Sequence, residues 1–292
     1  MTFLGIIQRS LIITINILQK FRVRYNTHKS GLLKLKVIFL LQHLKKLTRP
    51  QMWKFGHRGA LGNPHYDENT RWSFELALIK GANALKLDVR RTKDGVPVVI
   101  HDETIDRTTN GHGKIREILY RDLKIYHTDN GETIPTFADV FDWFGKKCLI
   151  NAEAREAGVA IEIGRIARAW DLEGSVIVSA FDSDDTDPDS NVSWNELRIL
   201  HARYPAISIA LLATEKKIKY LGYGEFVGIA QDMGAHAIHP EYTAVLHEPD
   251  LVNVAHSAQI RVNVWTVNSR WHIWRMKRLG VDGIISDFPQ RL

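Results

Sequence analysis

From residue 53 onward, short strand-like runs alternate with longer segments whose apolar residues recur every three or four positions. The short runs predict eight strands, at Trp53–Gly56, Leu85–Arg90, Leu149–Arg155, Val176–Phe181, Ile207–Leu212, Ala235–His239, Arg261–Val267 and Gly283–Ser286. The longer segments predict helices at Trp72–Lys80, Phe137–Phe144, Ala157–Trp170, Ser193–Tyr204, Lys216–Met233, Pro249–Gln259 and Arg270–Leu279. This alternation is typical of a (β/α)8 TIM barrel, and a doubly wound open sheet is the alternative.

The segment 85–102 shows the strand pattern most clearly. Apolar and polar residues alternate up to Arg90, Lys93–Gly95 is turn chemistry, and Val98–His101 predicts a ninth short strand. Residues 103–134 fit the alternation poorly, so we interpret them as a small insertion after the second strand and its short partner. Polar groups on an otherwise apolar strand need partners, because burying them unpaired is costly. Water, an ion, a phosphate or an active site would each satisfy them.

The positive charge of the chain is confined to its N-terminal part. Of the 39 Lys and Arg residues, ten lie in residues 1–50, which contain no Asp or Glu. The rest of the chain therefore has 29 basic and 33 acidic residues, a net charge of −4. No basic patch with interleaved aromatic residues is evident, so nucleic acid is not an expected partner. A single cysteine, Cys148, excludes an intrachain disulfide framework and a cysteine-based zinc site.

Residues 31–47 predict a basic amphipathic helix, with leucine and valine on one stripe and lysines opposite. Such a helix suits an anionic membrane surface, so we interpret residues 1–50 as a basic, partly helical extension with peripheral membrane contact. The alternatives are a helix packed on the domain, an organelle-targeting leader, or an extension without function. The apolar segment 3–19 is interrupted by polar residues, which argues against a spanning helix. The expected location is cytoplasmic or peripheral to a membrane.

Polar side chains recur where the predicted strands end. His57 and Arg58 follow the first strand, Asp88 lies on the second, and Glu153 and Arg155 lie on the third. The carboxyl ends of the strands in such a barrel meet at one mouth, where the chemistry of barrel enzymes takes place. One polar residue at a strand end is ordinary, but residues from several strands converging there favour a site.

Several motifs in order resemble the glycerophosphodiester phosphodiesterase family, whose barrels are similar to phosphatidylinositol phospholipases C. They are Gly56-His57-Arg58-Gly59, Glu68-Asn69-Thr70, the run from Asp88 to Asp102, Arg107-Thr108-Thr109 with Gly111, I-N-A-E-A-R at 150–155, V-S-A-F at 178–181, W-T-V-N at 265–268 and V-D-G-I-I-S-D-F-P at 281–289. The resemblance covers residues 53–292, and it implies a barrel enzyme that splits glycerophosphodiesters into glycerol 3-phosphate and an alcohol.

The resemblance also implies roles for particular residues. His57 and His101 match the acid/base pair of the family, and imidazole titrates near the working pH of such an enzyme. Arg58 matches a phosphate-binding residue, and a guanidinium fork suits phosphate oxygens. Arg155 stands where the family usually carries lysine, which keeps the charge. Each histidine alone is more often structural, but the pair at two strand ends favours catalysis.

The metal site implied by the resemblance is altered at one position. The family holds Mg²⁺ or Ca²⁺ with Glu-x-Asp on the second strand and Glu on the third, and here Asp88 and Glu153 match while Lys86 replaces the first Glu. An ammonium group among oxygen ligands repels a divalent cation. Three interpretations follow: Lys86 stands in for the metal, metal binds more weakly, or the protein binds a phosphodiester without turnover. Retention of the other site residues favours the first two.

Two classes of substrate are compatible with the sequence. A soluble glycerophosphodiester is expected, or a lysophospholipid giving lysophosphatidate if residues 1–50 bind membranes. Trp265 is a candidate wall of the substrate pocket, although a core aromatic would have the same sequence context.

Overall fold

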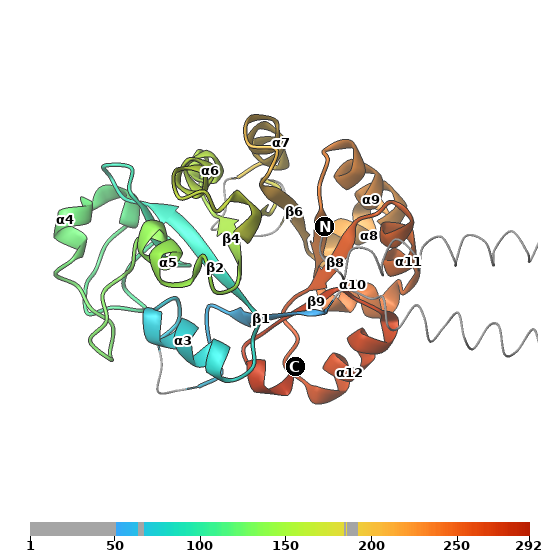
Figure 1. The fold of residues 1–292 in the computed structure, drawn as a ribbon, viewed down its shortest axis with the longest axis horizontal. Coiled ribbons are helices and arrows are strands. Elements are labelled where there is room, and N and C mark those ends of the chain that lie inside the picture. Colours follow the sequence, from blue (N-terminus) through green and yellow to red (C-terminus); the bar gives the residue numbers. More distant parts are fainter. Residues whose placement is uncertain (1–50, 64–66, 184, 186–191) are drawn as a thin grey trace, which may run out of the picture. The chain divides into compact units, whose positions relative to one another are not determined.

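The structure, a computed structural model, describes residues 51–63, 67–183, 185 and 192–292. In this part of the chain, eight parallel strands form a barrel with helices outside it (Figure 1). The barrel strands are β1 (Trp53–His57), β2 (Ala84–Arg91), β4 (Leu149–Ala154), β5 (Val176–Ala180), β6 (Ser208–Ala213), β7 (Ala237–Pro240), β8 (Arg261–Val264) and β9 (Gly283–Ser286). The predicted (β/α)8 barrel is therefore confirmed.

Strand β1 closes the barrel, because it pairs in parallel with both β9 and β2. An open sheet would leave β1 unpaired on one side, so the alternative architecture is excluded. The ninth strand, β3 (Pro97–Val99), pairs antiparallel with β2 only. It ends earlier than the predicted run, so His101 lies in the loop that follows the strand. That loop faces the same mouth as the carboxyl end of β1.

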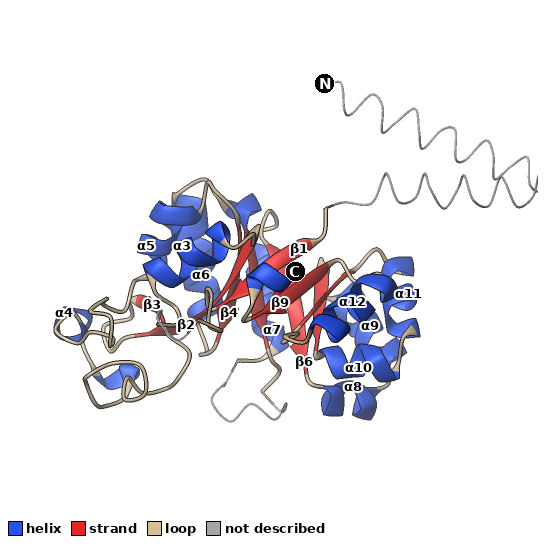
Figure 2. Cartoon of the chain, turned by 90° about the horizontal axis from the view of Figure 1, so that it is seen from below, coloured by secondary structure: helices blue, strands red, loops and turns tan. Residues whose placement is uncertain are grey.

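The helices surround the strands, which lie at the centre of the view in Figure 2. They are α3 (Arg71–Ile79), α5 (Phe137–Phe144), α6 (Val159–Ala169), α7 (Trp194–Arg203), α8 (Glu215–Leu221), α9 (Tyr223–Asp232), α10 (Tyr242–His247), α11 (Asp250–Ser257) and α12 (Arg270–Leu279). Local sequence explains several starts. The Thr70 side chain accepts a hydrogen bond from the Ser73 amide at the start of α3, and Thr136 and Asp139 form a capping box on α5.

The single helix predicted at Lys216–Met233 is wrong, because two helices occupy this segment. Gly222 separates α8 from α9 and has φ +83°, a conformation outside the right-handed helical region. Helix α10 was not predicted. It is only six residues long, too short for an amphipathic period to stand out.

The main hydrophobic core lies between the barrel and its helices, and it includes Phe74 on α3, Phe141 on α5 and Leu200 on α7. A second, smaller cluster surrounds Ile105 and Ile115 in the segment after β3. That segment contains the short helices η1 (Ile115–Glu117) and α4 (Tyr120–Leu123), and α4 lies at one end of the molecule in both ribbon views (Figures 1 and 2). The segment therefore has an apolar core of its own beside the barrel.

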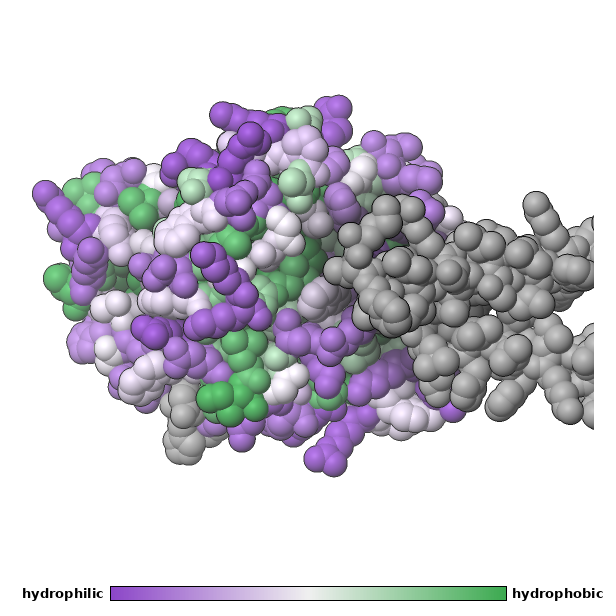
Figure 3. Space-filling view, in the orientation of Figure 1, coloured by the Kyte–Doolittle hydropathy of each residue, from purple (hydrophilic) through white to green (hydrophobic). Residues whose placement is uncertain are grey.

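Residues 52–292 form one compact unit. The predicted extension 1–50, with its basic helix at 31–47, lies outside the described residues. Within the described part of the chain, no helix is both long and apolar enough to cross a membrane. The visible face of the barrel is a mixture of hydrophilic and hydrophobic side chains (Figure 3).

Candidate active site

A pocket of about 280 Å³ lies at the carboxyl ends of the strands. The parallel register places Lys86 beside His57 and Asp88 beside Glu153. The pocket is lined by His57, Arg58, Lys86, His101, Glu153, Arg155, Phe181, Leu212, Thr214, Trp265, Thr266 and Ile285. The lining therefore combines three permanently charged cations and one carboxylate with an apolar wall, and all but one of the predicted site residues line it. The exception is Asp88, which is fully buried beneath the pocket.

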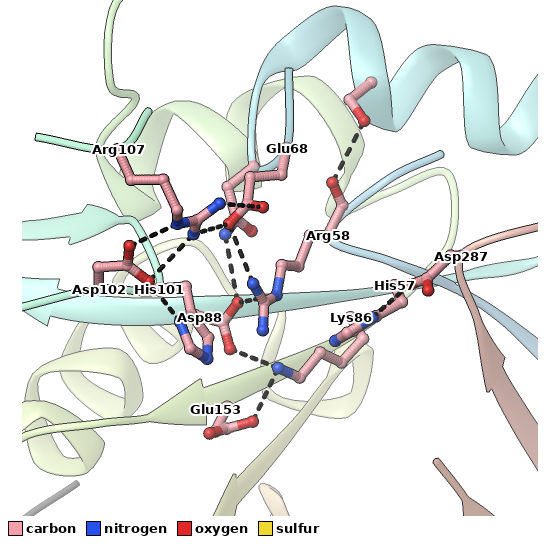
Figure 4. Close-up of polar contacts among 12 residues, drawn as sticks. His57, Arg58, Glu68, Lys86, Asp88, His101, Asp102, Arg107, Glu153 and Asp287 are labelled. Atoms are coloured by element: carbon pink, nitrogen blue, oxygen red, sulfur yellow. Dashed lines mark hydrogen bonds and ion pairs between the residues drawn. The ribbon is translucent and has the colours of Figure 1, made fainter. Parts of the chain in front are cut away.

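Lys86 bridges two buried carboxylates at the bottom of this site (Figure 4). Its Nζ donates to Oδ1 of Asp88 and lies 2.7 Å from Oε2 of Glu153. Burial is the largest single influence and would raise the pKa of each carboxyl group, but the charge of Lys86 and the neighbouring cations together outweigh it, so both pKa values are lowered. Arg58 assists at Asp88, and Arg155 assists at Glu153. Both carboxyl groups are therefore ionised at neutral pH and paired with Lys86.

Two arginines complete the charge pattern around the pocket. Arg58 Nε lies 3.2 Å from Oδ2 of Asp88, and Arg155 Nη1 donates to Oε1 of Glu153 at 2.6 Å. Arg58 has φ +52°, a left-handed conformation that costs energy for a residue other than glycine. The Arg58 amide donates to the Lys86 carbonyl at 2.8 Å, and the Arg58 carbonyl accepts a hydrogen bond from the Ser73 hydroxyl at 3.2 Å. These bonds hold the strained residue so that its side chain reaches the pocket.

His57 is held by the carboxylate of Asp287, which directly follows the last strand. Its Nδ1 lies 2.6 Å from Oδ1 of Asp287, and the Asn268 side-chain amide donates to Oδ2 of Asp287 at 2.6 Å. An ionised Asp287 accepts a hydrogen bond from Nδ1–H of His57, so in this tautomer Nε2 is the free nitrogen. Burial is the largest influence on the His57 pKa and lowers it, although the bond to Asp287 opposes this effect. The charges of Lys86 and Arg58 lower the His57 pKa further.

His101 has an equivalent arrangement on the other side of the pocket. Its Nδ1 lies 2.8 Å from Oδ1 of Asp102. Burial lowers the His101 pKa most, Asp88 opposes this effect, and the three pocket cations lower the pKa further. Both candidate acid/base groups therefore have Nδ1 tied to an aspartate and a pKa below the ordinary value of 6.5.

Arg107 joins the segment after β3 to the barrel (Figure 4). Its guanidinium donates twice to Asp102, at 2.6 and 3.0 Å, and twice to Glu68, at 2.9 and 2.8 Å. Glu68 in turn accepts from Arg58 Nη1 at 3.0 Å. Burial alone would raise the Asp102 pKa, but the bonds from Arg107 and His101 hold it well below its usual value. The chain Arg58–Glu68–Arg107–Asp102–His101 therefore links the guanidinium group of Arg58 to the imidazole of His101.

The sequence reasoning gave no role to the partners Glu68, Asp102, Arg107 and Asp287, although all four lie within motifs that carried the family resemblance. Asp102 directly follows His101, and Asp287 directly follows the last strand, so position in the chain offered a weak signal for both. No local signal in the sequence indicates that His57 pairs with Asp287, which lies 230 positions away.

A divalent cation does not fit these residues. Lys86 occupies the space between Asp88 and Glu153, and each of the four carboxylate oxygens faces an ammonium or guanidinium group. Hard cations need several free oxygen ligands and are repelled by an adjacent ammonium group. Within the described ranges, no group of three or more His, Cys, Asp or Glu residues has the arrangement of a metal site. Lys86 already places one positive charge between the two carboxylates.

A barrel with a charged pocket at the carboxyl ends of its strands has the architecture of a TIM-barrel enzyme. A sequence model of the glycerophosphoryl diester phosphodiesterase family matches residues 57–291, and the chain belongs to this family. It is 33% identical over 249 residues to the glycerophosphodiester phosphodiesterase of Caldanaerobacter subterraneus subsp. tengcongensis, covering 81% of this chain and 94% of that protein.

Solved structures agree on the fold. The glycerophosphodiester phosphodiesterase of Thermotoga maritima has a TM-score of 0.67 and 26% identity, covering 82% of this chain and 97% of that one. The Oleispira antarctica phosphodiesterase, solved with the product sn-glycerol-3-phosphate, has a TM-score of 0.66 and 22% identity, covering 84% and 96%. The family resemblance predicted from the motifs is confirmed.

Replacing Arg107 with alanine is expected to lower the free energy of unfolding by about 1–2 kcal/mol at pH 7, since Glu68 and Asp102 lose their shared partner. The folded-state pKa values of both acids are lowered, so the stability they contribute is present above their unfolded pKa values and is lost as the pH falls through the folded values. The difference between variant and native protein should therefore shrink below about pH 4 in urea titrations. Arg121→Ala is the control, because Arg121 pairs only with exposed Asp122. An equal loss of unfolding free energy in both variants would contradict a stabilising role for the bonds from Arg107 to Glu68 and Asp102.

Proposed function

We propose that this protein hydrolyses glycerophosphodiesters to glycerol 3-phosphate and an alcohol. The observation that carries the proposal is the pair of aspartate-held histidines, His57 and His101, lining one pocket with three cations. Family membership and the named activities of the relatives support it. The Oleispira antarctica complex supports a product of this class.

Proton transfer requires two groups on the two sides of the phosphorus atom. In the proposed mechanism, one imidazole takes a proton from the attacking water through its free Nε2 as the new P–O bond forms. The other imidazole donates its Nε2 proton to the leaving oxygen as the old P–O bond breaks. Asp287 and Asp102 orient the rings of His57 and His101 and stabilise whichever ring is protonated.

Phosphate binding is proposed for Arg58, Arg155 and Lys86, which all line the pocket. Guanidinium groups suit the paired oxygens of a phosphodiester, and Lys86 supplies a point charge close by. These cations are already tied to Asp88, Glu153 or Glu68, so they are preorganised before substrate enters. Preorganised charge stabilises the extra negative charge of the transition state without further rearrangement.

Lys86 is proposed to replace the Mg²⁺ or Ca²⁺ that the family generally uses. Its ammonium group lies between the two carboxylates that match metal ligands, and the geometry there leaves no free oxygen. A cation that binds weakly beside Lys86 is the less favoured form of the same proposal. The second candidate function is a phosphodiester-binding protein without turnover, and the same lysine is the observation that favours it.

The alcohol side of the substrate is proposed to lie against the apolar wall. Trp265 donates from its indole Nε1 to the His239 carbonyl at 2.7 Å, and its ring meets Phe181 edge-on with centroids 5.4 Å apart. The indole is therefore fixed while part of it lines the pocket.

A soluble glycerophosphodiester is the main proposed substrate, and a lysophospholipid is the alternative. We also propose that residues 1–50 are a basic extension, that residues 53–292 are the catalytic domain with an insertion at 103–134, and that the protein is cytoplasmic or peripheral to a membrane.

The test is glycerol 3-phosphate release by the full chain from glycerophosphocholine and glycerophosphoethanolamine, with lysophosphatidylcholine assayed for lysophosphatidate. Each reaction is run with Mg²⁺, with Ca²⁺ and with a chelator. Turnover that persists in the chelator and is lost in His57→Ala is expected. Turnover abolished by the chelator would reject the role of Lys86, and binding of a phosphodiester without any turnover would favour the second candidate.

A further inference from the structure

Helix α12 carries exposed tryptophans on its outer face. Trp271 is 59% exposed and Trp274 is 50% exposed, and they lie three residues apart on the same side of the helix. Ile273 and Met276 point the other way and are buried in the main core. The two indoles are therefore additional to what the helix needs to pack on the barrel.

The same helix is strongly basic, and its interleaved tryptophans correct the expectation that the chain has no basic patch with aromatic residues. It contains Arg270, Arg275, Lys277 and Arg278, and residues 268–281 contain no Asp or Glu. None of these four cations forms an ion pair with a carboxylate in the described part of the chain, whereas Arg165 and Arg168 on α6 both do.

The cations and the indoles lie together. The Arg278 guanidinium lies 5.1 Å from the centroid of the Trp274 ring, which keeps both groups on the outer face. Burial lowers the Lys277 pKa first, and the charge of Lys54 on β1 lowers it further. Lys54 therefore lies close enough to Lys277 to add a further cationic side chain near the carboxyl end of α12.

The helix also lies next to the pocket mouth. It starts four residues after Thr266, which lines the pocket with Trp265. The Tyr242 amide donates to the Trp265 carbonyl at 2.9 Å, and the Tyr242 ring lies 5.0 Å from the ring of His272. His272 in turn lies 5.0 Å from Trp271. A row of rings therefore runs from the pocket rim to the outer face of α12.

We propose that the outer face of α12 docks the barrel on an anionic phospholipid surface. Indoles prefer the headgroup level of a bilayer, and each Lys or Arg near an anionic surface strengthens binding roughly fivefold. Nucleic acid fits less well, because residues 51–292 carry a net charge of −4 and this basic face is only one helix long. This surface belongs to the barrel itself and is separate from the basic segment 31–47. Docking would bring the pocket mouth beside lipid headgroups.

The experiment is flotation of the full chain with phosphatidylcholine vesicles, with and without phosphatidylserine, at low and high salt. Native protein is expected to bind only the phosphatidylserine vesicles and to dissociate as salt rises. The variant Trp271→Ala/Trp274→Ala/Arg275→Gln/Arg278→Gln should bind at least roughly tenfold more weakly. The matched control on α6, Arg165→Gln/Arg168→Gln/Trp170→Ala, should bind like native protein. Thermal unfolding of both variants checks that they fold, and vesicle binding is read without reference to turnover.

Three results would overturn the proposal. They are native protein that binds neither vesicle, native protein that binds phosphatidylcholine equally well, and an α12 variant that binds as tightly as the α6 control. In the last case, the binding would come from another part of the chain. A folded α12 variant that loses binding while the α6 control keeps it supports the proposal.

Discussion

Replacing Lys86 with methionine is expected to lower the free energy of unfolding at pH 7 by about 3–5 kcal/mol, the cost of removing one partner of a buried ion pair. Asp88 and Glu153 would then be two buried carboxylates with only the arginines to compensate them. Urea unfolding of native protein and Lys86→Met measures the loss directly. A loss below about 1 kcal/mol would mean that water or rearranged arginines already satisfy the carboxylates.

The variant Lys86→Glu tests whether a divalent cation can bind at this site when the Lys86 ammonium group is replaced by a carboxylate. The native site has one ammonium group and two carboxylates, and this variant has three carboxylates instead. We therefore expect it to be unstable in a chelator and to be stabilised when Ca²⁺ or Mg²⁺ binds the folded state. Native protein and Lys86→Met should show little change in melting temperature with either ion. A native melting temperature that rises by several degrees with Ca²⁺ would show that a cation binds despite Lys86. This readout does not depend on activity, so it distinguishes loss of the metal from loss of the enzyme.

The second large effect is expected at the histidines. His57→Gln and His101→Gln should each lower kcat by roughly 10²–10⁴-fold, the usual contribution of a positioned acid or base. Because phosphate binding is assigned to the arginines and Lys86, KM should change far less. His112→Gln is the control, since His112 is 86% exposed in the insertion and pairs only with exposed Asp106. A variant of His57 or His101 with near-native kcat would remove that residue from the proposed mechanism.

The pH dependence of kcat/KM tests the same pair without mutation. The acid must be protonated and the base neutral, so the optimum lies between their two pKa values in the free enzyme. Burial and the pocket cations lower the pKa values of both His57 and His101 below 6.5. The optimum of kcat/KM is therefore expected below pH 6.5, with activity falling as the pH rises and the acid loses its proton. An optimum well above pH 7 would contradict this assignment.

Local pattern was sufficient for most of the barrel. All eight barrel strands were predicted within a few residues, because each is a short apolar run between helical segments and the run length is a local property. The error at Lys216–Met233 arose where apolar periodicity continued across Gly222, whose positive φ ends one helix and separates it from the next. The candidate histidines and the change at Lys86 were also visible locally, since each lies in a short motif.

The sequence by itself determined the order of strands and helices, the residues at the strand ends, and the presence of a lysine where the family carries a glutamate. Only the tertiary structure decided what that lysine contacts. The β2–β4 register brings Asp88 level with Glu153, and this register depends on packing around the whole barrel. Barrel closure through β1 and β9 likewise brings Asp287 to His57. Such contacts join residues far apart in the chain, so no local pattern of hydrophobic and polar positions encodes them.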